Sequence, residues 1–442
     1  MTIKLSDHFT YGRILRFTLP SIAMMIFSSI YGVVDGFFVS NFVGKTPFAA
    51  VNFIMPFLMI LGAFGFMFGT GGSALISKTV GEGDNDRANR IFSMITYVSI
   101  GTGVIIASLG VIFLRPIASL LGAEGQLLED CVTYGRIILL ALPAFMLQME
   151  FQSFFITAEK PGIGFAVTVA SGVANMVLDA LFIAVFEWGL VGAALATATS
   201  QIIGGVAPII YFSRKNNSIL KLTRWHFDAH SLLKTCTNGS SELMSNLSMS
   251  LVSMLYNIQL MKYAGEDGVA AYGVLMYVCM IFIAIFIGYS IGTAPIIGYN
   301  YGAANHAELK NIRKKSLTII SICSVAMVIL GELLALPLSK LFAGAYPELL
   351  RLTLRGFFIF SFSFLFSGIA IFGSGFFTAL NNGLISALIS FMRTLIFQVA
   401  AVLILPLIWQ IDGIWASIVV AELLAAITTA LFMIFMRKKY NY

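Results

Sequence analysis

The chain has 442 residues, of which 58% are hydrophobic and 11% are charged, and its mean hydropathy is +0.91. An ordinary soluble domain carries about 25% charged residues. This composition excludes an ordinary soluble globular protein and indicates an all-α polytopic membrane protein. The net charge of +6 is compatible with nucleic-acid binding, but the distribution of the basic residues excludes that interpretation, as the topology below indicates.

Twelve apolar stretches predict membrane-spanning helices, because a helix needs about 20 residues to cross a bilayer. In chain order they cover 14–40, 47–77, 91–113, 134–157, 163–186, 190–213, 236–262, 269–298, 315–337, 354–380, 384–409 and 412–436. The N-terminus lacks a short apolar core followed by a small-residue cleavage site, so we expect no signal peptide. The four cysteines lack metal-ligand spacing, and we expect them to be buried free thiols.

The loops between these spans sort by charge. Alternate loops on one side, together with both termini and the central segment, carry 19 Lys and Arg residues, whereas the other side carries six. Arg136 and Arg393 fall near or within predicted helices and belong to neither count. The positive-inside rule therefore predicts a multi-pass protein of a cell membrane, such as a bacterial inner membrane, with both termini in the cytoplasm.

The two halves of the chain match at an offset of 221 residues. Gly71 corresponds to Gly292 and Gly81 to Gly302, in similar sequence contexts. Six helices per half return the chain to its starting side, so both halves share one orientation about a pseudo-two-fold axis along the membrane normal. We expect a six-helix unit over 1–213, a linker over 214–235 and a second six-helix unit over 236–442. Two such bundles suit alternating access, although duplication alone also produces rigid scaffolds and channels.

Two aspartates, Asp35 and Asp179, lie inside predicted membrane helices, where a carboxylate costs at least about 2.5–3.5 kcal/mol. Asn175 precedes Asp179 by one helical turn, so the two share a helix face. Counting the helical rise from the predicted ends places these residues and Thr197 at a similar depth, about 8–16 Å from the outer boundary. Together they predict an oxygen-rich pocket for a proton or Na⁺. The alternative is that each group caps or bridges neighbouring helices.

Four further acidic residues stand in apolar surroundings and are candidates for contact with a cationic substrate. They are Glu150, Glu242, Glu332 and Glu422. Glu242 also fits an interfacial position near a helix start. The competing interpretation for this group is ion pairing, for instance with Arg393 on a neighbouring helix.

The chain resembles the MATE (multidrug and toxic compound extrusion) family over essentially its whole length. The resemblance rests on the two six-helix halves, Pro20 ahead of Asp35, the turn after Gly71–Gly81, and residues 188–200 (WGLVGAALATATS). It implies export of a substrate, often amphipathic and cationic, driven by inward movement of Na⁺ or H⁺.

In one MATE subgroup, a cation site combines Asp on the first helix, Asn and Asp one turn apart on the fifth, and Thr on the sixth. The resemblance assigns these places to Asp35, Asn175, Asp179 and Thr197. Some members carry a second acidic site in the C-terminal half. Here the corresponding positions are Tyr256, Ile396, Ala400 and Ile418, so we expect ion coupling in the N-terminal half.

The leading hypothesis is a secondary active exporter that functions as a monomer, takes small-molecule substrates, and uses Na⁺ or H⁺ as coupling ion without another cofactor. No GxxxxGK[ST] phosphate loop or HExxH motif is present, and the four histidines lie in predicted loops or tails, so we expect neither a nucleotide partner nor an enzyme. A flippase for a lipid-linked substrate is the alternative, although it would be expected to have a more cationic cavity. An ion channel remains a further hypothesis.

Overall fold

The computed structural model describes residues 3–224, 226–343 and 346–442, and these residues form helices without any strand. The α-helices of the first half are α1 (Tyr11–Phe38), α2 (Lys45–Gly81), α3 (Asn85–Leu120), α4 (Gly125–Thr157), α5 (Pro161–Asp179) and α6 (Gly189–Ser213). Those of the second half are α7 (Ala229–Gly302), α8 (His306–Ala343), α9 (Pro347–Phe360), α10 (Phe364–Ala379), α11 (Gly383–Phe391), α12 (Phe397–Ile404), α13 (Pro406–Phe435) and α14 (Arg437–Tyr440).

Short π- or 3₁₀-helical turns continue or connect some of these helices. They are η1 (Val39–Val43), η2 (Ala180–Val185), η3 (Ser361–Ser363) and η4 (Met392–Ile396). Because η3 joins α9 to α10 and η4 joins α11 to α12, each of these pairs forms one long helical span.

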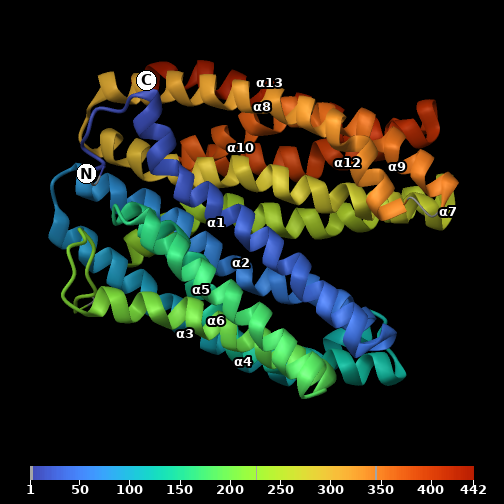
Figure 1. The fold of residues 1–442 in the computed structure, drawn as a ribbon. Helices are drawn as coiled ribbons and strands as arrows, with labels where there is room; N and C mark the ends of the chain where they lie inside the picture. Colours follow the sequence, from blue (N-terminus) through green and yellow to red (C-terminus); the bar gives the residue numbers. More distant parts are fainter. Residues whose placement is uncertain (1–2, 225, 344–345) are drawn as a thin grey trace.

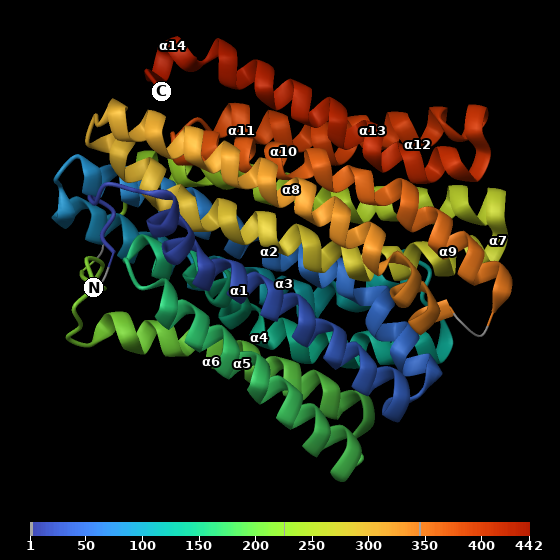
Figure 2. The ribbon, with the colours of Figure 1, turned by 45° about the horizontal axis from the view of Figure 1, so that its top comes forward.

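Eleven continuous helical segments among the described residues are long and apolar enough to cross a membrane. The 74-residue α7 counts once among them, although its chain reverses at Gly265, where φ is 64° and ψ is −154°. Its two arms lie side by side in Figures 1 and 2. A second break at Gln410 separates the last two spans. Counting the arms of α7 separately gives the twelve predicted spans.

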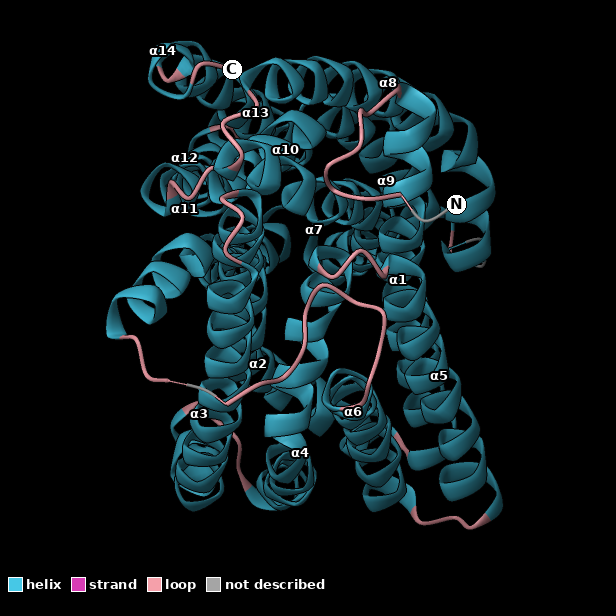
Figure 3. Ribbon diagram, turned by 90° about the vertical axis from the view of Figure 1, so that its left-hand side faces the viewer, coloured by secondary structure: helices cyan, strands magenta, loops and turns pink. Residues whose placement is uncertain are grey.

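The helices form two bundles, the first built from α1–α6 and the second from α7–α13, and the bundles diverge away from the end that carries both chain termini (Figure 1). Figure 3 looks onto this end, which we call the terminal face. There α6 ends at Ser213 and α7 starts at Ala229. The predicted 214–235 linker therefore overlaps the first turns of α7 and includes Trp225, which lies outside the described residues. The predicted division into 1–213, 214–235 and 236–442 stays a prediction.

Each bundle has its own buried apolar core, and the first half of α1 packs into the core of the second bundle. Ile14, Phe17 and Met24 of α1 are buried within the core of the second bundle. Glycines permit this approach, because a Cβ at Gly288 of α7 would lie 2.6 Å from Cα of Ile22. The first half of α1 is therefore part of the contact between the bundles.

A similar contact joins α2 to the first arm of α7. A Cβ at Gly239 would lie 1.9 Å from the carbonyl oxygen of Met67, and one at Gly71 would lie 2.0 Å from that of Thr235. Met67 and Gly288 are 221 residues apart, so the two contacts are related by the sequence repeat. The bundles thus meet backbone to backbone at repeat-related places.

Candidate functional site

The candidate site lies where α1, α5 and α6 pack together in the first bundle. Asp35 stands in the last turn of α1, and Asp179 is the last residue of α5 before the π-helical turn η2. Gly172 allows α1 and α5 to approach, because a Cβ there would lie 2.5 Å from the Phe27 ring. Such π-helical turns are frequent at functional sites.

All four residues of the predicted cation site meet here. The hydroxyl of Thr197 on α6 donates a hydrogen bond to Oδ1 of Asp35 at 3.5 Å. The Asp35 carboxyl also lies close to the side chains of Asp179 and Asn175 on α5. The equal depth estimated from the helix ends therefore corresponds to actual proximity.

Asp179 is the anomalous member of this group. Its side chain is fully buried, with 0% exposure, and neither carboxyl oxygen has a hydrogen-bond partner among the described residues. Two ionised carboxylates share no hydrogen, so the proximity of Asp35 does not satisfy these oxygens. An isolated buried carboxylate is strongly unfavourable. The pair requires either a proton between the two side chains or a cation beside them.

The four side chains together offer oxygens of the kind that hard cations prefer: two carboxyl groups, an amide carbonyl and a hydroxyl. Asn175 is 2% exposed, and within the described chain its Nδ2 has no hydrogen-bond partner. The amide of Asn175 is therefore not committed to another interaction. This donor set fits Na⁺, and the adjacent carboxyls fit a shared proton equally well.

Two tyrosines at this site were not identified from the sequence. The buried Tyr134 of α4 lies beside Thr197, and its hydroxyl is close enough to Asp35 and Asp179 to be influenced by their charges. Tyr31 of α1 lies near Asp35 as well. Tyr31 precedes Asp35 by one helical turn, and that spacing is the signal that could have revealed it. Tyr134 lies a hundred residues away in an aromatic-rich chain and offers no such signal.

A chain of buried polar groups leads from Thr197 further along the bundle. The Ser200 hydroxyl donates to the Thr197 carbonyl oxygen at 2.8 Å, and the Ser171 hydroxyl donates to the Ser200 carbonyl oxygen at 2.7 Å. Gln148 then donates through Nε2 to Ser171 at 3.2 Å. These bonds link α4, α5 and α6 through polar groups, so a change in the position of Thr197 affects all three helices.

The other predicted acidic residues lie in three different environments. Glu150 is fully buried in α4, where its carboxyl lies near Ser99 and Thr96 of α3, and neither carboxyl oxygen has a hydrogen-bond partner among the described residues. Glu332 of α8 accepts a hydrogen bond from Ser361. Neither residue belongs to the site around Asp35.

Glu422 and Glu242 share one basic partner in the second bundle. Arg393 donates from Nε to both carboxyl oxygens of Glu422, at 2.9 and 3.1 Å. Arg393 also exerts its charge on the half-buried Glu242. The predicted alternative of an ion pair with Arg393 is therefore confirmed for Glu422. A role in substrate contact stays a prediction for all four acidic residues.

Comparison with known protein families gives one match in each of the two bundles. The MatE family profile matches two stretches, residues 20–181 and 243–404, which together make up most of the chain. The first match contains Asp35, Asn175 and Asp179, and it ends before Thr197. The two matches also agree with the internal repeat predicted from the sequence.

Relatives and solved structures cover nearly the whole chain. The Multidrug export protein MepA of Staphylococcus saprophyticus is 26% identical over 438 residues, which are 96% of this chain and 94% of the relative. MepA of Staphylococcus aureus is 24% identical and covers 97% of this chain and 94% of the relative. A structure described as the outward-facing conformation of a multidrug resistance MATE family transporter superposes with a TM-score of 0.93 at 22% identity, covering 98% of this chain and 97% of that one. This structural likeness establishes the fold.

Proposed function

This chain belongs to the MatE family, and from that premise we propose that it is a secondary active multidrug exporter that couples inward movement of Na⁺ or H⁺ to extrusion of amphipathic, often cationic compounds. The buried Asp179 carboxyl beside Asp35 is the observation on which the coupling proposal depends. A permanently unpaired carboxylate there would only destabilise the bundle. A carboxylate that alternately binds and releases a cation performs a transport step.

In the proposed coupling, a proton or Na⁺ binds to and leaves one pair of carboxyl groups. When Asp35 and Asp179 hold a proton or Na⁺, their mutual repulsion is relieved and α1 and α5 can approach. Release of the cation restores the repulsion and favours a different packing of α1, α5 and α6. Because Thr197 bonds to Asp35, α6 responds to the same event.

Alternating access is proposed from the contacts between the bundles. The contacts at Gly71, Gly239 and Gly288 hold the bundles together toward the terminal face, whereas the bundles diverge at the opposite end (Figure 1). With both termini in the cytoplasm, as the positive-inside rule predicts, the bundles diverge toward the outside. Rocking about these glycine contacts would open the terminal face instead.

The name of the MepA relatives supports small-molecule drugs as the substrate class. Glu150 and Glu332, which are not paired with a basic side chain among the described residues, would favour cationic members of that class. We propose export without catalysis and without a bound nucleotide, with Na⁺ or H⁺ as a transported substrate.

The test is efflux of a fluorescent lipophilic cation from proteoliposomes, with the Na⁺ gradient and the pH gradient imposed separately. Coupled export predicts that at least one gradient drives the cation uphill, and that the reverse drug gradient drives the ion. Passive downhill conductance without exchange would instead indicate a channel. Movement of lipid-linked substrates without drug efflux would indicate a flippase.

A further inference from the structure

A pocket of about 440 Å³ lies at the terminal face, between the first turns of α1 and the start of α5. The segment that precedes α1 covers one side of it. The lining residues come from these three elements: Ile3, Arg16, Phe17, Glu159, Lys160, Pro161, Gly162 and Ile163. None of them belongs to the site around Asp35, so the pocket is a separate feature of the first bundle.

Two cations in the pocket wall are available to a ligand. Across the described ranges, the side chains of Arg16 and Lys160 form neither a hydrogen bond nor an ion pair within the protein. Arg16 is exposed and Lys160 is half-buried. An arginine guanidinium and a lysine ammonium on facing walls suit a phosphate group, which accepts hydrogen bonds from both.

The one acidic residue in the wall is already engaged. Glu159 accepts a hydrogen bond through Oε1 from the backbone amide of Leu5 at 2.7 Å. Burial, with a smaller contribution from the charge of Asp7, raises the pKa of the Glu159 carboxyl, while the Leu5 amide and the charges of Lys4 and Lys160 oppose that shift. Glu159 thus fixes the N-terminal segment against the α4–α5 turn, and the free charge in the pocket is positive.

Apolar surface continues from the pocket along the outside of α1. Leu19 follows Arg16 by three residues, so it lies on the same helix face, and it is 63% exposed; the adjacent Leu15 is 45% exposed. Phe17, Pro161 and Ile163 supply apolar wall within the pocket itself. A ligand with a phosphate in the pocket and hydrocarbon chains beside Leu19 would satisfy both parts of this surface.

We propose that this pocket binds the phosphate of an anionic membrane phospholipid, with Arg16 and Lys160 as its ligands and the acyl chains along α1. Basic pockets between transmembrane helices commonly hold anionic headgroups. The terminal ends of α1 and α5 bring the two cations to the level where spanning helices leave the hydrocarbon. The proposal requires neither export activity nor a particular coupling ion.

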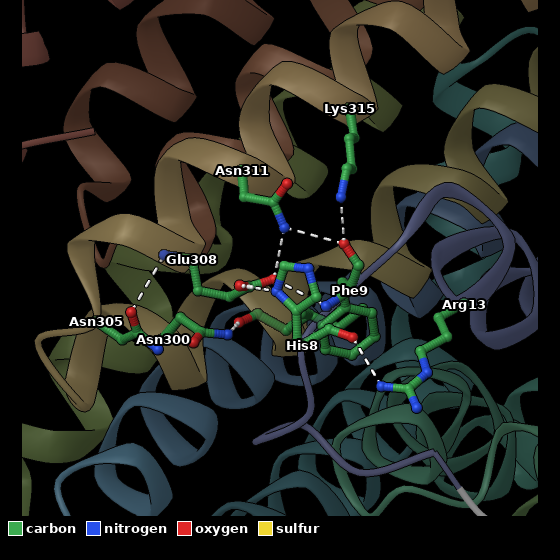
Figure 4. A network of polar contacts seen from close by, with 9 residues as sticks. His8, Phe9, Arg13, Asn300, Asn305, Glu308, Asn311 and Lys315 are labelled. Carbon is green, nitrogen blue, oxygen red and sulfur yellow. Dashed lines mark hydrogen bonds and ion pairs between the residues drawn. The ribbon is translucent and has the colours of Figure 1, made fainter.

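The bound lipid would also act on the second bundle, because the covering segment is attached to both. Beyond Leu5, the amide of Phe9 donates to Oε1 of Glu308 on α8 at 2.9 Å, and Nδ1 of His8 lies 2.7 Å from its Oε2 (Figure 4). Lys315 donates to the carbonyl oxygen of Phe9 at 2.7 Å. A lipid that holds the segment in place should therefore favour the arrangement in which the bundles meet at the terminal face.

The experiment measures thermal unfolding of the full-length protein in detergent, with added phosphatidylglycerol, phosphatidylcholine or inorganic phosphate. Native mass spectrometry counts the bound lipids in parallel. The test variant is Arg16→Gln/Lys160→Gln. The matched control is Arg87→Gln/Arg90→Gln, which removes two exposed cations from the start of α3 at the same face.

We expect phosphatidylglycerol to raise the unfolding midpoint of the wild type and of the control by several degrees, and to raise that of the test variant by less than half as much. One tightly retained phosphatidylglycerol should disappear from the mass spectrum of the test variant only. Equal shifts in all three proteins, or no shift in the wild type, would overturn the proposal. A shift of the same size with inorganic phosphate would overturn the assignment to a lipid. Because neither cation forms a side-chain hydrogen bond or an ion pair in the described protein, the lipid-free midpoints should agree, which separates lost binding from lost folding.

Discussion

Gly81 and Gly302, which are 221 residues apart, each pack against the backbone beside the other. A Cβ at Gly81 would lie 2.1 Å from the carbonyl oxygen of Tyr299, and a Cβ at Gly302 would lie 2.0 Å from that of Lys78. The ends of α2 and of the second arm of α7 thus cross at a repeat-related pair of glycines. No side chain larger than hydrogen fits this crossing without movement of a backbone.

Gly302→Ala should therefore weaken the contact between the bundles at the terminal face. Overpacking of this kind costs about 1–3 kcal/mol. Gly101→Ala is the matched control, because no atom lies within 4 Å of its added Cβ in the middle of α3, and it should be neutral or stabilising by about 0.5–1 kcal/mol. Thermal unfolding of both variants checks this. Equal midpoints in the two variants would contradict the close crossing.

The sequence predicted this arrangement up to a definite limit. Apolar length, charge distribution and the 221-residue offset are local or periodic properties, so they predicted the twelve spans, the break between residues 262 and 269, and the match of Gly81 with Gly302. The contacts between bundles depend on helix rotation and crossing, which hydropathy does not encode. The contact between Gly302 and Lys78 is therefore visible only in the structure.

The same limit applies to the candidate site. Asp35 and Asp179 are identifiable because a charge in an apolar helix is costly wherever the helix lies. Tyr134 carries no such cost, since a phenol is common in membrane helices, and only packing places it beside Thr197. From the sequence, Glu422 could either contact substrate or pair with Arg393. Helix order alone does not decide which helix faces meet, so the sequence left both interpretations open.

Asp179→Asn should abolish export and leave the protein folded. The asparagine keeps the size of the side chain but removes the charge that binds the cation. Since the Asp179 oxygens have no hydrogen-bond partner in the described protein, the substitution removes a desolvated charge without breaking a bond. We expect efflux at the level of empty liposomes, and an unfolding midpoint equal to or above that of the wild type. Wild-type efflux would disprove the coupling role, whereas a large fall in the midpoint would indicate a structural one.

Thr197→Ala should weaken the dependence on the coupling ion more than it weakens drug binding. The hydroxyl contacts Asp35 and offers one oxygen to a cation, whereas no observation places it against a drug. The Na⁺ concentration for half-maximal efflux should rise several-fold, and the drug affinity measured by fluorescence should change little. Thr197→Ser, which retains the hydroxyl, should restore the wild-type value. A proportional loss of both quantities, without rescue by serine, would show that Thr197 only supports packing.

The second bundle allows a stability test of its buried ion pair. Glu422 is 5% exposed and lies 2.9 Å from Arg393, and breaking such a pair costs about 3–5 kcal/mol. Arg393→Met should be worse than Glu422→Gln, because it leaves two carboxyls without their cation, whereas Glu422→Gln leaves Arg393 beside Glu242. The double variant Arg393→Met/Glu422→Leu should recover much of the loss. A double-mutant cycle on unfolding midpoints measures this, and additive effects would show that the pair contributes no coupling energy.

The N-terminal segment provides a test of how the two bundles are held together. Leu5 and Phe9 are fully buried, and Phe9 is attached to α8 of the second bundle although it lies two residues before α1 of the first (Figure 4). With so short a connection, the segment cannot follow α8 when the terminal ends of the bundles separate. The bonds between Phe9 and Glu308 must therefore break in that movement.

Glu308→Ala should accordingly shift the protein toward the arrangement that is open at the terminal face. It removes the acceptor for the Phe9 amide, His8 and Asn311, and hydrogen bonds to a charged group contribute about 1.5–3 kcal/mol each when fully formed. Spin labels at exposed positions 86 and 310, introduced after the native cysteines are replaced, report the separation across this face.

We expect a larger population of long distances between the two labels in Glu308→Ala than in the parent protein. Glu348→Ala is the matched control, because it removes a carboxylate whose pair with Arg351, at 3.2 Å, is largely exposed and lies within one helix. That variant should leave the distances unchanged. If both variants give the parent distribution, the segment adds nothing to the balance between the two arrangements. The glycine contacts between the bundles, among them the crossing at Gly81 and Gly302, would then hold the terminal face closed.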